Sequence, residues 1–207
     1  MIKILDCLDK DVRDKSNGII LNIIKAGANE LEEGQQHPYY NQLSSDGTIS
    51  QLIQLYKNED ESIVQYSFEQ TFAYLFRTLP LPPIIRKEIV DLLKIVSDFE
   101  QLAFLAESQE NHDAILEENF ESELLKSKFH TIDDLKLIYN LLKYGSNSNK
   151  IKVALAVKDK VEKFADDEYL EEFNNSMEYE FLKLNDEGKL KIKDKATGII
   201  ALNTTII

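Results

Sequence analysis

The residues best suited to chemistry lie in the sequence ENHDAILEENFESELLKSKF, residues 110–129. His112 stands next to Asp113, and Glu117 and Glu118 follow one helical turn later. A histidine beside carboxylates at this spacing is typical of a metal site or of an acid–base pair. The alternative is that these side chains form the solvated face of a packed helix. The elements that position them decide between the two.

Apolar residues recur at intervals of three and four positions along most of the chain, which predicts helices. We expect helices over 48–57, 61–77, 84–96, 98–107, 112–118, 121–129, 132–144, 149–165 and 167–184. Three of them end on similar phrases, FAYLF, LAFLA and IYNLL, in which Leu75, Leu105 and Leu141 are equivalent. These leucines are 30 and 36 residues apart. An irregular period of this length is the size of one helical unit in a repeat protein.

The stretch ENHDAILEENF resembles the first short helix of an armadillo repeat. That helix usually has asparagine and arginine followed by Ala-Ile-Val-Glu-Ala-Gly. Asn111, Ala114, Ile115 and Glu117 match this pattern, and Asn119 stands where glycine is usual.

Two further helices of the armadillo repeat have counterparts. GTISQLIQL, residues 47–55, is similar to the second helix, with Ser50 where proline is common. NEDESIVQYSFEQTFAYL (58–75) and SDFEQLAFLA (97–106) are similar to the long third helix. The resemblance covers residues 47–165, and the order of the helices is its most specific feature.

The resemblance implies an all-α fold, a short right-handed superhelical solenoid of three to five armadillo-like units over residues 1–184. In such a unit Ala114 and Ile115 enter the core, and His112 and Asp113 lie on the outer face. Carboxylates on a solvated helix do not converge on a metal ion, which needs three or four ligands. We therefore expect no catalytic residue, no metal and no cofactor.

Armadillo proteins hold extended peptides in a concave groove lined by their third helices. Members of the importin-alpha type carry a tryptophan on each of these helices and an asparagine four residues later. The corresponding residues here are Gln70, Tyr74, Glu100, Phe104, Lys136 and Asn140, with Glu69 and Ala73 as alternatives for the first pair. The chain has no tryptophan, and only Asn140 keeps the family's residue. The resemblance thus implies these six as partner-binding residues but argues against recognition of nuclear-import cargo.

The charge of the chain bears on its partners. The net charge is −13, all of it from residues 1–125, and nine acids but no Lys or Arg lie between Lys94 and Lys126. Such a surface repels nucleic acid and favours a basic protein or peptide, unless it is simply a solvated acidic face. No apolar run is long enough for a membrane helix. The single cysteine, Cys7, fits the reducing cytoplasm or nucleus.

Two segments have more than one interpretation. HPYYNQ, residues 37–42, is either a surface loop that folds Tyr39 or Tyr40 over the core, or a contact loop or phosphorylation site. The tail, residues 185–207, alternates Lys with Leu and Ile and then becomes apolar and β-branched. We expect it to pair as strands, to dock on the last helices, or to be disordered.

The sequence favours a monomeric, non-enzymatic scaffold or adaptor that binds a partner protein or an extended peptide. The alternative is an all-α enzyme or a small-ligand-binding helical bundle. An open groove between helices supports the first, and a closed pocket lined by buried acids or histidine supports the second.

Overall fold

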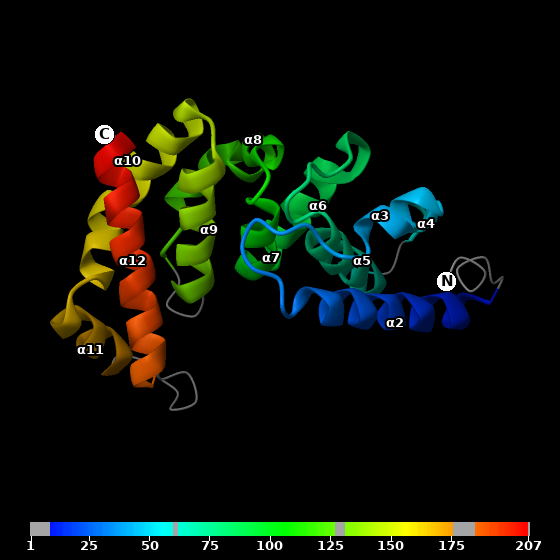
Figure 1. The fold of residues 1–207 in the computed structure, drawn as a ribbon, viewed down its shortest axis with the longest axis horizontal. Coiled ribbons are helices and arrows are strands. Elements are labelled where there is room, and N and C mark those ends of the chain that lie inside the picture. Colours follow the sequence, from blue (N-terminus) through cyan, green and yellow to red (C-terminus); the bar gives the residue numbers. More distant parts are fainter. Residues whose placement is uncertain (1–8, 60–61, 127–130, 176–184, 207) are drawn as a thin grey trace. The chain divides into compact units, whose positions relative to one another are not determined.

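Helices account for all the regular structure in the described part of the chain, as the sequence predicts. The computed structural model describes residues 9–59, 62–126, 131–175 and 185–206, and Figure 1 shows their fold. These residues form two compact units, 1–110 and 111–207. No described helix is both long and apolar enough to span a membrane. Cys7 lies outside the described residues.

The first unit contains six helices in its described residues, labelled as in Figure 1. They are α2 (Lys10–Ala28), α3 (Tyr40–Ser45), α4 (Thr48–Lys57), α5 (Ser62–Leu75), α6 (Pro83–Ile95) and α7 (Phe99–Leu105). Asp9 and Asp98 cap α2 and α7, because their carboxylates accept hydrogen bonds from backbone N–H groups of the first turn. The turn Gln109–Asn111 (η1) follows α7.

Helix α5 is the centre of the first unit and packs against α2, α4, α6 and α7. Phe72, on its apolar stripe, is completely buried, as predicted. Its ring lies between those of Phe68 and Phe76, and the ring of Tyr56 from α4 meets it edge-on at 5.9 Å. An aromatic row of this kind contributes both apolar burial and favourable ring geometry.

The HPYYNQ segment turns inward at His37 and at Tyr40, the first residue of α3. His37 is buried, its Nε2 donating to the carbonyl of Ile24 (2.9 Å) and its Nδ1 accepting from the N–H of Tyr39 (3.2 Å). Burial holds the pKa of His37 below its usual value. The ring of Tyr40 packs edge-on against Phe76 at 5.3 Å. The interpretation in which a tyrosine folds over the core is therefore confirmed for Tyr40.

The second unit has its longest helices in its C-terminal part. Its described elements are α8 (His112–Ile115), η2 (Glu117–Ser122), α9 (Thr131–Tyr144), α10 (Asn147–Phe164), α11 (Asp167–Asn175) and α12 (Asp186–Ile206). Helices α9, α10 and α12 pack against one another (Figure 1). Leu141 of α9 is fully buried, as its place on the apolar stripe predicts.

The helix predicted over 112–118 is confirmed only for His112–Ile115 (α8), and the helix predicted over 121–129 is wrong within the described residues. Glu118, Asn119 and Leu125 have φ angles of 61°, 57° and 58°, in the left-handed region that a right-handed helix cannot include. The chain therefore forms the short α8 and a 3₁₀ segment instead. Residues 127–129 lie outside the described part.

The tail is a helix, so the strand and disordered interpretations are wrong for residues 186–206. Ile192, Ala196, Ile199 and Asn203 are buried at spacings of four, three and four, the period of a helix. Leu190, whose alternation with lysine resembled a strand, is 57% exposed. Docking on the preceding helices is the interpretation that holds, since α12 packs on both α9 and α10.

Candidate functional site

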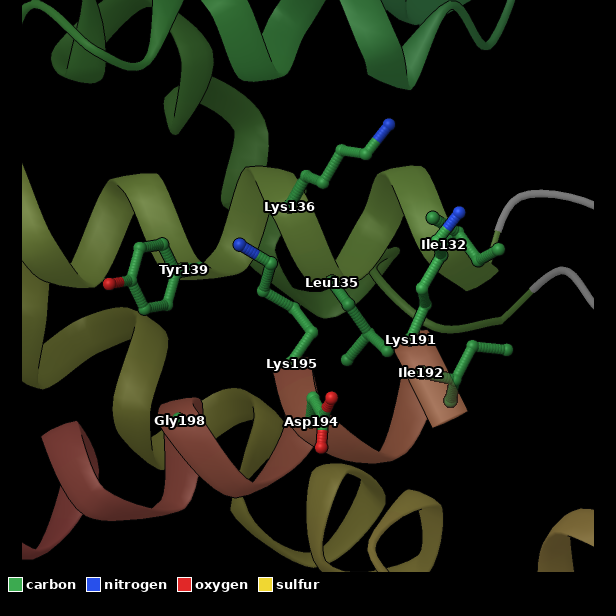
Figure 2. Close-up of a pocket in the computed structure, with 9 residues that line it drawn as sticks. All are labelled: Ile132, Leu135, Lys136, Tyr139, Lys191, Ile192, Asp194, Lys195 and Gly198. Atoms are coloured by element: carbon green, nitrogen blue, oxygen red, sulfur yellow. The ribbon is translucent and has the colours of Figure 1, made fainter. Parts of the chain in front are cut away.

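A groove of about 420 Å³ lies between α9 and α12 in the second unit (Figure 2). Its lining consists of Ile132, Leu135, Lys136 and Tyr139 from α9, and Lys191, Ile192, Asp194, Lys195 and Gly198 from α12. Ile132 lies at the end of the groove where Lys191 lies, and Tyr139 lies at the end where Gly198 lies (Figure 2). The two helices therefore run in the same direction along the groove.

Helical spacing explains why the α9 residues share this face. Positions 132, 135, 136 and 139 recur at three, four and seven residues, so they fall on one side of a helix. Leu135 is completely buried and forms part of the floor. Ile132 and Tyr139 are half-buried and remain accessible from the groove.

On α12 the floor is Ile192, which is 1% exposed, and Gly198 lines the groove near Tyr139. A Cβ on Gly198 would lie 3.6 Å from Cε2 of Tyr139, an ordinary van der Waals distance. The glycine therefore leaves free a space beside the tyrosine ring that even a methyl group would fill.

Lysines give the groove its charge. The Nζ atom of Lys195 lies 4.1 Å from the centroid of the Tyr139 ring, a cation–π contact. Lys136 pairs with Asp133 at 3.0 Å, and Lys191 pairs with Glu187 at 2.6 Å. The Lys191–Glu187 pair is exposed, and exposed ion pairs contribute only about 0–1 kcal/mol, so a bound anion can replace Glu187 at little cost. The groove thus offers an apolar floor and cationic groups at its rim.

Four of the six predicted partner-binding residues lie in the first unit. Tyr74 and Phe104 do come together, with ring centroids 5.2 Å apart, and Arg77 lies over the Phe104 ring at 5.1 Å. Tyr74 is 5% exposed, so the surface it was expected to offer a peptide is mostly covered. Gln70 donates to the hydroxyl of Tyr66 (3.2 Å).

The other three predicted partner-binding residues, Glu100, Lys136 and Asn140, do not lie together on one surface of a single unit. Glu100 lies half-exposed in the first turn of α7. Lys136 and Asn140 lie on α9 in the second unit. Lys136 lines the groove, whereas Asn140 is 6% exposed. Among the six, Lys136 is therefore the residue that the structure places in a groove.

The expected position of His112 is wrong. Its side chain is completely buried, not on an outer face, while Asp113 is exposed as expected and accepts from Asn149 Nδ2 (2.9 Å). Burial follows from the close approach of Gly145, whose absent side chain leaves room for the His112 ring. The described residues hold no group of three His, Cys, Asp or Glu side chains suited to a metal ion.

Two buried carboxyl groups lie away from the groove floor. Burial raises the pKa of Glu69 on α5 to about 7, and the nearby carboxylates of Glu88 and Asp98 raise it further. Burial likewise raises the pKa of Asp134 on α9 to about 7, against the opposing hydrogen bond from the N–H of Leu125 (3.1 Å). These groups respond to pH but do not converge on a common cavity.

The α12 half of the groove was missed because the tail was not recognised as a helix. The signal was present in the stripe of Ile192, Ala196, Ile199 and Asn203. Comparison of the chain with protein-family models, curated proteins and solved structures finds no match. What the protein does must therefore be inferred from its own residues.

Proposed function

We propose that this chain is a non-enzymatic interaction module that binds a segment of a partner protein in the α9–α12 groove. One observation carries the proposal, the combination of a buried apolar floor at Leu135 and Ile192 with a rim of exposed charged side chains. Grooves between helices bind protein segments in this way, with apolar anchors below and polar groups that fix the orientation above.

The proposal includes an armadillo-like stacking of the helices. Its support is the similar sequences FAYLF, LAFLA and IYNLL near the ends of α5, α7 and α9. Leu75, Leu105 and Leu141, the equivalent residues of these phrases, are all completely buried near the C-terminal ends of α5, α7 and α9. The proposed binding site differs from the groove of third helices that the family resemblance implies.

A small-ligand-binding function is the second candidate, because 420 Å³ is within the range of small-molecule sites, roughly 300–1,000 Å³. The first candidate fits the lining better. Lys191 and Asp194 are exposed at the rim, so the groove is open to a ligand longer than its own floor.

Site-specific photo-crosslinking tests the proposal. A photoreactive amino acid replaces Lys191 at the rim, and in a control chain it replaces Leu155, which is 63% exposed on α10. We expect one protein to crosslink from position 191 in cells of the source organism and not from position 155. A second change, Gly198→Leu, fills the groove and should remove that crosslink.

Two results would contradict the interaction function. The first is the same set of proteins crosslinked from both positions. The second is no protein from position 191 together with a small molecule retained by the purified chain in native mass spectrometry. The second result would favour the small-ligand candidate.

A further inference from the structure

We propose that the α9–α12 groove selects acidic segments that insert one aromatic side chain beside Tyr139. This inference rests on the interaction function proposed above and adds the chemistry of the partner. It reverses the expectation from the net charge of the chain, which favoured a basic partner.

The first argument is local charge. Lys136, Lys191 and Lys195 line the groove, against the single carboxylate of Asp194. Outside the lining, Lys143 Nζ lies 5.0 Å from the centroid of the Tyr144 ring and 5.5 Å from that of Tyr139. A carboxylate from a bound segment can take the place of Glu187 on Lys191, because that pair is exposed, whereas the pair of Lys136 with Asp133 is half-buried.

The second argument is the shape of the floor. Leu135 and Ile192 are buried at the floor of the 420 Å³ groove, the Tyr139 ring forms one wall, and Gly198 keeps the groove wider by the size of a methyl group. A flat aromatic side chain fits such a space, because it contacts the aliphatic floor and the edge of the tyrosine ring together. The anchor of the segment is therefore expected to be Phe, Tyr or Trp.

The third argument separates a short acidic segment from larger polyanions. Residues 111–207 contain 14 Lys and Arg against 19 Asp and Glu, a net charge of −5. A long phosphate array, whether nucleic acid or an anionic membrane, would be repelled by the acids around the lysines. A short acidic segment is attracted mainly by the lysines at the groove, because electrostatic interactions between exposed charges are screened beyond about 8 Å at physiological salt.

Fluorescence polarisation with the full chain tests the inference. The probe is a short labelled peptide of Asp, Glu and Ser with one central Phe. Three matched peptides replace the Phe by Ala, the acids by their amides, or the acids by Lys. We expect the acidic Phe peptide to bind, the Ala peptide to bind about tenfold or more weakly, and the Lys peptide not to bind.

Variants of the groove locate the binding. Lys195→Met should weaken binding of the acidic peptide roughly two- to fivefold, and Asp194→Asn should strengthen it by a similar factor. The matched control is Asp159→Asn, an exposed carboxylate on α10 outside the groove. Gly198→Leu should abolish binding, and Gly198→Ala, which a helix accepts readily, should weaken it without loss of thermal stability.

Preferential binding of the Lys peptide, or equal affinity in the parent and Gly198→Leu chains, would overturn the inference. So would binding to vesicles of anionic lipid in place of the acidic peptide. If the crosslink from position 191 still captures a protein while no acidic peptide binds, the interaction function stands and the acidic specificity is wrong. If both the crosslink and the peptides fail, both proposals fail.

Discussion

Arg77 and Glu107 form an ion pair in the interior of the first unit, with Arg77 Nη2 2.6 Å from Glu107 Oε1 and both side chains more than nine-tenths buried. The pair also holds the backbone of the turn after α2. Glu107 Oε2 accepts from the N–H of Gly34 (2.9 Å), and Arg77 Nη2 donates to the carbonyl of Glu32 (3.3 Å). Residues from three separate segments are thus joined by one buried pair.

Removal of either partner should destabilise the chain strongly. We expect Arg77→Met or Glu107→Met to lower the free energy of unfolding by roughly 3–5 kcal/mol, because the other charge stays buried without its partner. The double variant, with both Arg77→Met and Glu107→Met, should lose less free energy of unfolding than the sum of the two single losses, because neither charge is then left unpaired. Urea unfolding measures all three. Lys87→Met, which breaks the exposed pair with Asp91, is the control and should lower the free energy of unfolding by less than about 1 kcal/mol. Equal losses of stability in Arg77→Met and Lys87→Met would contradict the prediction.

Truncation of a core side chain in either unit should be costly. We expect Phe72→Ala and Leu141→Ala each to destabilise by about 2–5 kcal/mol, because both side chains are completely buried and leave cavities. Ile95→Ala is the control, since Ile95 is 76% exposed. Thermal melts compare the three variants. Melting temperatures of the core variants equal to that of Ile95→Ala would show that these helices do not pack as described.

Gly145 should not tolerate a side chain. A Cβ there would lie 2.4 Å from the carbonyl oxygen of Leu141 and 3.0 Å from Nδ1 of His112, so either the backbone or the buried ring must shift. We expect Gly145→Ala to destabilise by about 1–3 kcal/mol. Gly18→Ala in α2, with nothing within 4 Å, should instead stabilise by about 0.5–1 kcal/mol. The same sign for both substitutions in chemical denaturation would count against the buried position of His112.

Stability should fall as pH rises toward neutrality. The pKa of Glu69 and that of Asp134 are raised to about 7 in the folded state, above their ordinary values of 4.5 and 3.8. The folded chain therefore holds these protons more tightly than the unfolded chain, and the stability gained at low pH is lost as pH rises to about 7.

Neutral isosteres isolate this effect. Glu69→Gln and Asp134→Asn should each raise the melting temperature by several degrees at pH 8 and by clearly less at pH 5, because the loss of stability has only begun at pH 5 and is complete above pH 7. Glu30→Gln, at an exposed position, is the control. Equal shifts at the two pH values would mean that the substitutions act through packing and not through protonation.

The sequence by itself determined most of the helices. Over 48–57 the predicted limits are those of α4, because the stripe of Ile49, Leu52 and Tyr56 admits no other period. The burial of Phe72 and Leu141 also follows from local spacing alone. Amphipathic periodicity is a local property, so it can be recognised without knowledge of the partner surface.

The tail shows the limit of that local information. Lys189, Leu190, Lys191 and Ile192 satisfy the alternation of a strand, while the stripe that begins at Ile192 satisfies the period of a helix. Only the surface offered by α9 and α10 decides between them, because that surface buries the helical stripe and leaves Leu190 in solvent.

Tertiary structure alone decided the position of His112 and the existence of the groove. His112 meets Gly145, and Tyr139 meets Gly198 and Lys195, across long separations in sequence. Sequence periodicity predicts on which face of its own helix a residue lies. It does not predict which other helix packs against that face. That choice depends on the packing of the whole unit, where burial of apolar surface selects one set of neighbours from many.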